Sequence, residues 1–154
     1  MTPLRSLVPV LFVVAAATFA GGAVPAFAAA CDTVRIFTLE TAQKSAWETK
    51  NWESLYAFNI EEAKYTDSCG HKEGGAQQMR DLQSAAVHYN AAGGTELGRK
   101  WFDLAKKHFE RSNQIIAQVL RQRTDANVRD MLEHYKMNND DGIKRAARHQ
   151  STMG

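Results

Sequence analysis

The chain has 154 residues, of which 44% are hydrophobic and 23% charged, and its formal net charge is +2 at pH 7. Because this balance is close to neutral, composition gives no bulk attraction to nucleic acid or another polyanion. Acidic side chains nevertheless outnumber basic ones up to Gly98, and basic ones prevail from Arg99 onward. Such asymmetry is typical of a molecule with two differently charged ends or of one with a partner surface.

Residues 1–28 have the pattern of a secretory signal peptide. Arg5 supplies an early positive charge, an apolar segment runs from Leu7 to Ala20, and Ala26-Phe27-Ala28 resembles a peptidase cleavage site. The apolar segment is too short to span a bilayer. We therefore expect cleavage after Ala28, a mature chain over 29–154 without a membrane span, and a periplasmic or secreted location.

Cys31 and Cys69 are the two cysteines of the chain. In an exported protein, two cysteines most simply form one disulfide. Closing a loop of this length stabilises a fold by about 3–4 kcal/mol on the loop-entropy model. The alternative is a lipoprotein anchored through an acylated Cys31, although Ala28 stands where such sites usually have leucine.

Helical periodicity of apolar residues runs through the mature chain. It predicts helices over 34–49, 52–68, 76–92, 96–123 and 125–137. Lys50-Asn51 interrupts the first pair, a glycine-rich turn over 69–75 follows the second helix, and Gly93-Gly94 is expected to end the third. The sequence therefore predicts an all-α fold of two antiparallel helical hairpins plus a terminal helix, arranged as a repeat stack or as a closed bundle.

The apolar pattern stops near residue 138, and the remaining residues are polar and basic. A segment with so few apolar side chains has little surface to bury and tends to stay disordered. We expect a helical domain over 29–140 and a disordered basic tail over 141–154.

Histidine is the residue type most compatible with a metal ion or haem in such a helical bundle. The five histidines include no pair at i, i+3 or i+4, so no predicted helix carries two adjacent ligands. His108 lies on the apolar face of the fourth helix and would need His88 or His134 beside it to bind a metal. We predict no cofactor, with this histidine site as the alternative.

Enzyme motifs are missing from the sequence. There is no G-x-S-x-G, no P-loop and no dinucleotide fingerprint, and oxidised cysteines are not nucleophiles. The adjacent Glu61 and Glu62 have the spacing of a solvated helix face. Lys100, Lys107 and Arg111 are expected opposite the core, which does not favour a nucleic-acid partner. We predict that the protein is not an enzyme.

One helical segment, Met79–Ser112, resembles the tetratricopeptide repeat. That repeat places large, small and aromatic residues at fixed positions of a 34-residue unit, and matching residues here are Leu82, Ala85, Ala86, Tyr89, Gly93, Gly98, Phe102 and Ala105. Glu110 stands where the repeat has proline, and the second helix is longer than the unit allows.

The resemblance implies a groove that binds a protein or peptide partner through polar residues on the first helix of each pair. Candidate residues are Gln83, His88 and Asn90 in the matching unit and Asn59 in the preceding hairpin. We therefore predict a small exported helical protein-interaction module without catalytic activity. The alternative function is a helical bundle that binds a metal ion or haem through His108 and another histidine.

Overall fold

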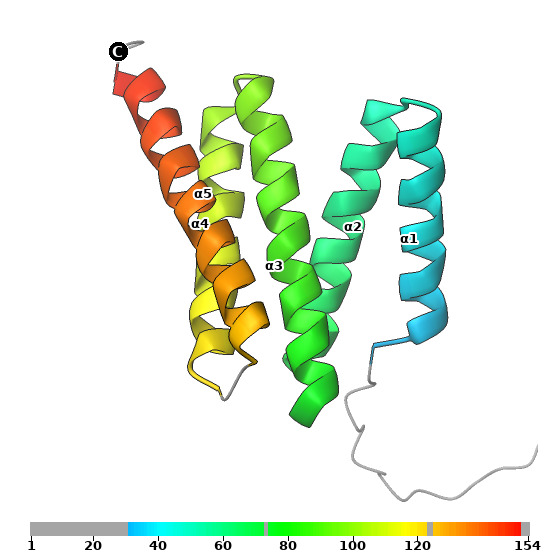
Figure 1. Ribbon diagram of the computed structural model, residues 1–154. Coiled ribbons are helices and arrows are strands. Elements are labelled where there is room, and N and C mark those ends of the chain that lie inside the picture. The colour runs from blue at the N-terminus through cyan, green and yellow to red at the C-terminus, as the bar shows by residue number, and fades with distance from the viewer. Residues whose placement is uncertain (1–30, 73, 123–124, 152–154) are drawn as a thin grey trace, which may run out of the picture.

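The computed structural model describes residues 31–72, 74–122 and 125–151 (Figure 1). The predicted signal peptide lies outside these ranges. The described residues form helices and no strand, which confirms the all-α prediction. Over these described ranges the helices are α1 (Thr33–Glu48), α2 (Trp52–Gly70), α3 (Gly75–Gly98), α4 (Phe102–Leu120) and α5 (Ala126–Ser151).

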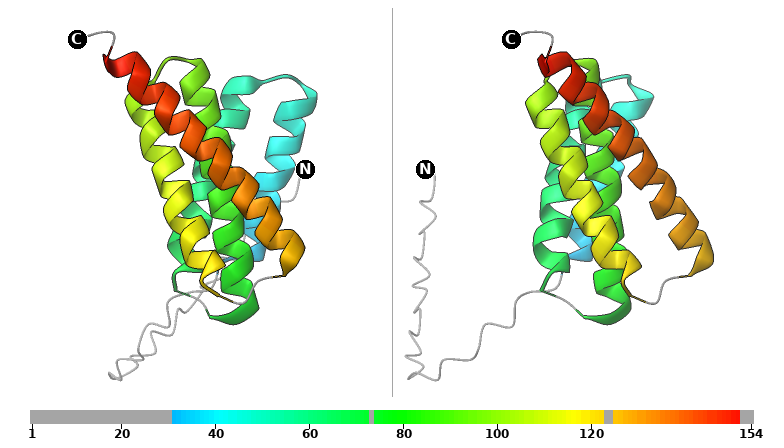
Figure 2. Two further views of the ribbon diagram at one scale, coloured as in Figure 1. Left: turned by 60° about the vertical axis from the view of Figure 1, so that its left-hand side comes forward. Right: turned by 90° about the vertical axis from the view of Figure 1, so that its left-hand side faces the viewer.

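Successive helices run in opposite directions and lie beside one another (Figure 1). Helix α3 is central, because it contacts α2, α4 and α5, whereas α1 packs against α2 alone among the described elements. Helix α5 crosses obliquely over α4 and α3 (Figure 2). Within the described residues α2 and α4 make no close backbone contact. Helix α3 therefore lies between α2 and α4 and packs against both.

The apolar core lies along α3 and spreads onto α2, α4 and α5. Fully buried side chains such as Leu82, Ile115 and Leu132 each gain about 1.5–3 kcal/mol from leaving water. The core residues are Ala63, Leu82, Ala85, Ala86, Tyr89, Ile115, Ile116, Val119 and Leu132. Because α1 contributes none of them, the first helix is an outer layer on α2.

The turns that follow α1 and α3 have the same backbone geometry. Lys50 and Lys100 adopt positive φ angles of 55° and 63°. In the first turn the Asn51 N–H donates to the Ala46 carbonyl, and in the second the Trp101 N–H donates to Glu96, at 2.8 and 2.9 Å. A left-handed residue after the last helical turn is a common way to end a helix. The predicted break at Lys50-Asn51 is confirmed.

The predicted break at Gly93-Gly94 is wrong, because α3 continues through both glycines to Gly98. Gly93 is needed for packing and not for a turn. A Cβ atom at Gly93 would lie 2.8 Å from Cδ1 of Phe109, and one at Gly142 of α5 would approach the same ring more closely still. Phe109 is only 3% exposed, so its ring fills the space that the two glycines leave between α3 and α5.

The expected disordered tail is also wrong over 141–151, where α5 continues to Ser151. Gly142 and Ala146 are buried on the inner face of this segment. Small residues let the helix backbone approach its neighbours closely, so the segment packs without large apolar side chains. The domain boundary at residue 140 therefore does not exist in the described structure, and residues 152–154 lie outside it.

The disulfide joins Cys31 to Cys69, as predicted, with Cα atoms 5.1 Å apart. It ties the start of the described chain to the last turn of α2. Since both sulfur atoms are used, acylation of Cys31 is incompatible with this structure. None of the described helices combines the length and hydropathy needed to cross a membrane.

Gly93→Ala and Gly94→Ala test the packing role of the first glycine. Gly94 faces open space in α3, so alanine there should stabilise the protein by about 0.5–1 kcal/mol through helix propensity. Alanine at Gly93 should destabilise it by about 1–3 kcal/mol, because the Phe109 ring cannot move away freely. Urea unfolding of both variants measures these free energies. Equal effects at the two positions would contradict the packing role.

Candidate binding groove between α2 and α4

A groove of about 570 Å³ lies between α2 and α4, with Tyr89 of α3 in its lining. On α2 the lining residues Tyr56, Ile60 and Lys64 recur every fourth position and so share one face. Helix α4 supplies Leu104, Lys107, His108, Glu110, Arg111 and Gln114. Both helices run in the same direction (Figure 1). The groove therefore has an apolar end at Tyr56 and Leu104 and a basic end at Lys64 and Arg111.

A fully buried carboxylate joins the three helices at the apolar end. Glu96 of α3 is 0% exposed. The Tyr56 hydroxyl donates to its Oε1 at 2.6 Å, and Nδ1 of His108 lies 2.8 Å from its Oε2. A buried charge is strongly destabilising without such partners. The Tyr89 ring stacks on His108 with centroids 5.4 Å apart. This network fixes α2 and α4 on opposite sides of α3.

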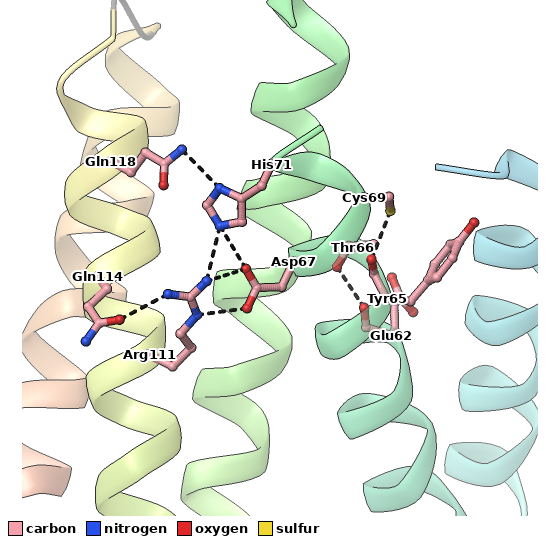
Figure 3. Close-up of polar contacts among 9 residues, drawn as sticks. All are labelled: Glu62, Tyr65, Thr66, Asp67, Cys69, His71, Arg111, Gln114 and Gln118. Atoms are coloured by element: carbon pink, nitrogen blue, oxygen red, sulfur yellow. Dashed lines mark hydrogen bonds and ion pairs between the residues drawn. The ribbon is translucent and has the colours of Figure 1, made fainter. Parts of the chain in front are cut away.

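A second carboxylate joins α2 to α4 at the basic end (Figure 3). Arg111 donates to Asp67 through Nη2 at 2.6 Å and through Nε at 2.8 Å. His71 Nε2 lies 3.0 Å from Asp67 Oδ1. A bidentate arginine–carboxylate pair is among the stronger and more directional polar contacts in proteins. The hydrogen bond that Arg111 donates to Asp67 raises the pKa of Arg111 despite the opposing effect of burial.

Lys64 and Lys107 are the cations of the groove that the described residues leave without an ion pair. Arg111 is neutralised by Asp67, and Glu110 lies 3.8 Å from Lys106. Lys64 and Lys107 are exposed on opposite walls. The groove can therefore attract an anionic group between its walls and accept apolar atoms at the other end.

Another buried network lies between α1, α2 and α3. Glu62 is 0% exposed, so the expected solvated position is wrong for Glu62, while its neighbour Glu61 is exposed. Gln43 and Ser84 donate to Glu62 at 2.7 and 2.9 Å, and His88 Nε2 lies 3.0 Å from it. Burial alone raises the pKa of Glu62, but the hydrogen bonds and charge of its partners, His88 first, lower it below 4.5 overall.

The predicted partner-binding residues do not form one site. His88 and Asn59 are brought together, with Nδ1 and Oδ1 2.8 Å apart, but they belong to the Glu62 network. Asn90 donates to Asn139 of α5 at 2.8 Å. Gln83 is half-buried elsewhere on α3. None of these four residues lines the groove.

The three histidines of the predicted metal site have separate partners. His108 contacts Glu96, His88 contacts Glu62 and Asn59, and His134 lies against Tyr135 with ring centroids 6.4 Å apart. Among the described residues, no group of three or more histidine, cysteine, aspartate or glutamate side chains is placed to hold a metal ion.

Sequence reasoning missed the buried acids and their cross-helix partners. Both partners of Glu96 lie on other helices, and Asp67 is paired with Arg111 of α4 besides the nearby His71, so the sequence around each acid does not identify it as buried. One signal was present: His108 lies on an apolar helical face, where a polar side chain needs a partner.

No family model, curated protein or solved structure matches this chain. The interpretation of the groove therefore depends on its geometry.

Tyrosine ionisation tests the two carboxylate networks under the groove. Burial, followed by Glu96, raises the pKa of Tyr56 to about 12, and burial together with Asp67 raises that of Tyr89 to about 12. Both pKa values exceed the ordinary 10.0. The neutral hydroxyls therefore make their full contribution to the free energy of unfolding below pH 10.0, and this contribution is lost as the pH rises toward 12.

Tyrosinate absorbance after a rapid pH jump should therefore show two late-ionising groups. Tyr56→Phe and Tyr89→Phe should each remove one of them. Ionisation of both groups near the ordinary pKa in the folded protein would contradict the described networks.

Acid unfolding tests the Glu62 network. The pKa of Glu62 is lowered in the fold, so its contribution is present above 4.5 and is lost as pH falls through the lower folded value. Glu62→Gln should flatten the loss of stability between neutral pH and about pH 3 in urea unfolding. Glu61→Gln is the matched control, because exposed ion pairs contribute little. A wild-type acid dependence in Glu62→Gln would refute the assignment.

Proposed function

We propose that this protein is an exported, non-catalytic module that binds an acidic segment of a partner protein in the groove between α2 and α4. The observation that carries the proposal is the charge of the groove. Lys64 and Lys107 face it from opposite walls without an ion pair to a described residue, while the cations and acids beneath them are already paired.

The chemistry of the lining favours an anion with an adjoining apolar part. Lysine ammonium groups attract carboxylates from several directions and need no fixed geometry. Tyr56, Ile60 and Leu104 offer apolar surface at the other end of the same groove. An amphipathic acidic helix or strand presents both features along its length, which is a recurring mode of peptide recognition.

The arrangement of the helices supports a scaffold role. We further propose that α1–α2 and α3–α4 are two copies of one antiparallel hairpin unit, with α5 as the terminal helix. The equivalent turns at Lys50 and Lys100 support this interpretation. Helices stacked side by side leave grooves between alternate members, which is also what the resemblance to tetratricopeptide repeats implies.

The absence of catalysis in this proposal follows from the roles of the titratable groups in the groove. Tyr56 and His108 are both bound to the buried Glu96, and Arg111 is bound to Asp67. These contacts hold the walls in place, and moving a proton or the side chain during a reaction would disrupt them. A binding role uses the two lysines without disturbing this framework.

Photo-crosslinking tests the proposal. A photoreactive amino acid replaces Leu104 in the groove or Met137, which is 70% exposed on α5. We expect a discrete protein adduct from the Leu104 position and not from the Met137 position. The double variant Lys64→Gln/Lys107→Gln should reduce the adduct about tenfold, because each rim charge contributes up to about 1 kcal/mol.

Lys50→Gln/Lys100→Gln makes the same change in net charge outside the groove and is the matched control. It should leave the adduct unchanged. Adducts that form equally from Met137, or that do not depend on Lys64 and Lys107, would contradict binding in the groove.

A further inference from the structure

All three tryptophans of the chain lie in or beside the turns that follow α1 and α3. Trp47 is in the last turn of α1, Trp52 begins α2, and Trp101 is in the turn before α4. Their exposed fractions are 64%, 51% and 46%. Figure 1 shows both turns at the end of the molecule where α5 also finishes. We call this surface the tryptophan end and define it by the three tryptophans with Lys50, Lys100, Arg145 and Arg148.

The tryptophans are held in place by the turns and by their neighbours. The left-handed Lys50 and Lys100 fix the two turns. Trp47 and Trp52 pack edge to face with ring centroids 5.4 Å apart, and Arg99 lies 5.0 Å from the Trp101 ring. Exposed large apolar side chains gathered on one surface usually mark an interaction site.

The charge of the tryptophan end is positive. Two acidic side chains there are paired with cations, Glu48 with Lys44 and Glu53 with Arg99 at 2.7 Å. Asp103 accepts a hydrogen bond from the neutral Gln150 and keeps its negative charge. Four cations, Lys50, Lys100, Arg145 and Arg148, take part in no ion pair within the described residues. The stacking of His149 on Phe102, with centroids 4.8 Å apart, holds the basic end of α5 beside α4.

We infer that the tryptophan end binds the surface of an anionic phospholipid bilayer. Indole rings prefer the water–lipid interface, because the ring is apolar and its N–H remains hydrogen-bonded. Lysine and arginine beside them are attracted to anionic headgroups. The combination of exposed tryptophans and uncompensated cations fits a lipid surface better than an uncharged partner. This binding is peripheral and is independent of the groove.

Intrinsic fluorescence tests the inference, because each tryptophan of the chain belongs to this surface. The purified mature protein is mixed with vesicles of phosphatidylglycerol and phosphatidylcholine or of phosphatidylcholine alone. We expect a blue shift and co-sedimentation with the anionic vesicles, weak binding to the neutral ones, and loss of binding in high salt. No blue shift with anionic vesicles, or equal binding to both kinds, would overturn the inference.

Lys50→Gln/Lys100→Gln should weaken partitioning by roughly 30-fold, from the attraction of each cation to the anionic surface. Lys64→Gln/Lys107→Gln carries the same charge change in the groove and should bind like the wild type. Both pairs are exposed, and circular dichroism checks their folding. Greater loss from the groove variant, or no loss from Lys50→Gln/Lys100→Gln, would place lipid binding elsewhere and overturn the assignment.

Discussion

The buried carboxylate of Glu96 is the constraint on which the arrangement of the helices depends. The side chain is 0% exposed, and its burial is tolerated because Tyr56 of α2 and His108 of α4 contact it from both sides of α3. These two hydrogen bonds therefore fix the positions of α2 and α4 relative to α3. Asp67 and Arg111 repeat this connection toward the other end of the same helices. Within the part of the chain that the structure describes, α2 and α4 make no close backbone contact, and these polar contacts connect them instead.

The charged side chains of the molecule fall into two groups, those that are buried and paired and those that are exposed without an ion pair. Acids under the groove and in the Glu62 network are enclosed and paired, whereas Lys64 and Lys107 stay open on the groove walls. At the tryptophan end Glu48 and Glu53 are likewise paired, and Lys50 and Lys100 have no ion pair to a described residue. The molecule thus has two cationic surfaces. One is the groove between α2 and α4, where the lysines lie beside Tyr56, Ile60 and Leu104, and the other is the tryptophan end, where they lie beside exposed indole rings.

Local sequence patterns predicted the helices and the first turn because those features depend on neighbouring residues. Contacts between distant residues could not be inferred in the same way. Gly93-Gly94 has the composition of a turn, yet Gly93 is small because Phe109 packs against it. The last turns of α5 contain few large apolar residues, but Gly142 and Ala146 are buried through close helix approach. Burial of Glu96 depends on partners twelve and forty residues away.

A double-mutant cycle of Tyr56→Phe and Glu96→Gln, measured by urea unfolding, tests the central constraint most directly. A hydrogen bond from a hydroxyl to a buried carboxylate should give a coupling energy of about 1.5–3 kcal/mol between the two positions. That value would show that α2 is held to α3 through Glu96. Additive effects of the two substitutions, with a coupling energy near zero, would contradict the account.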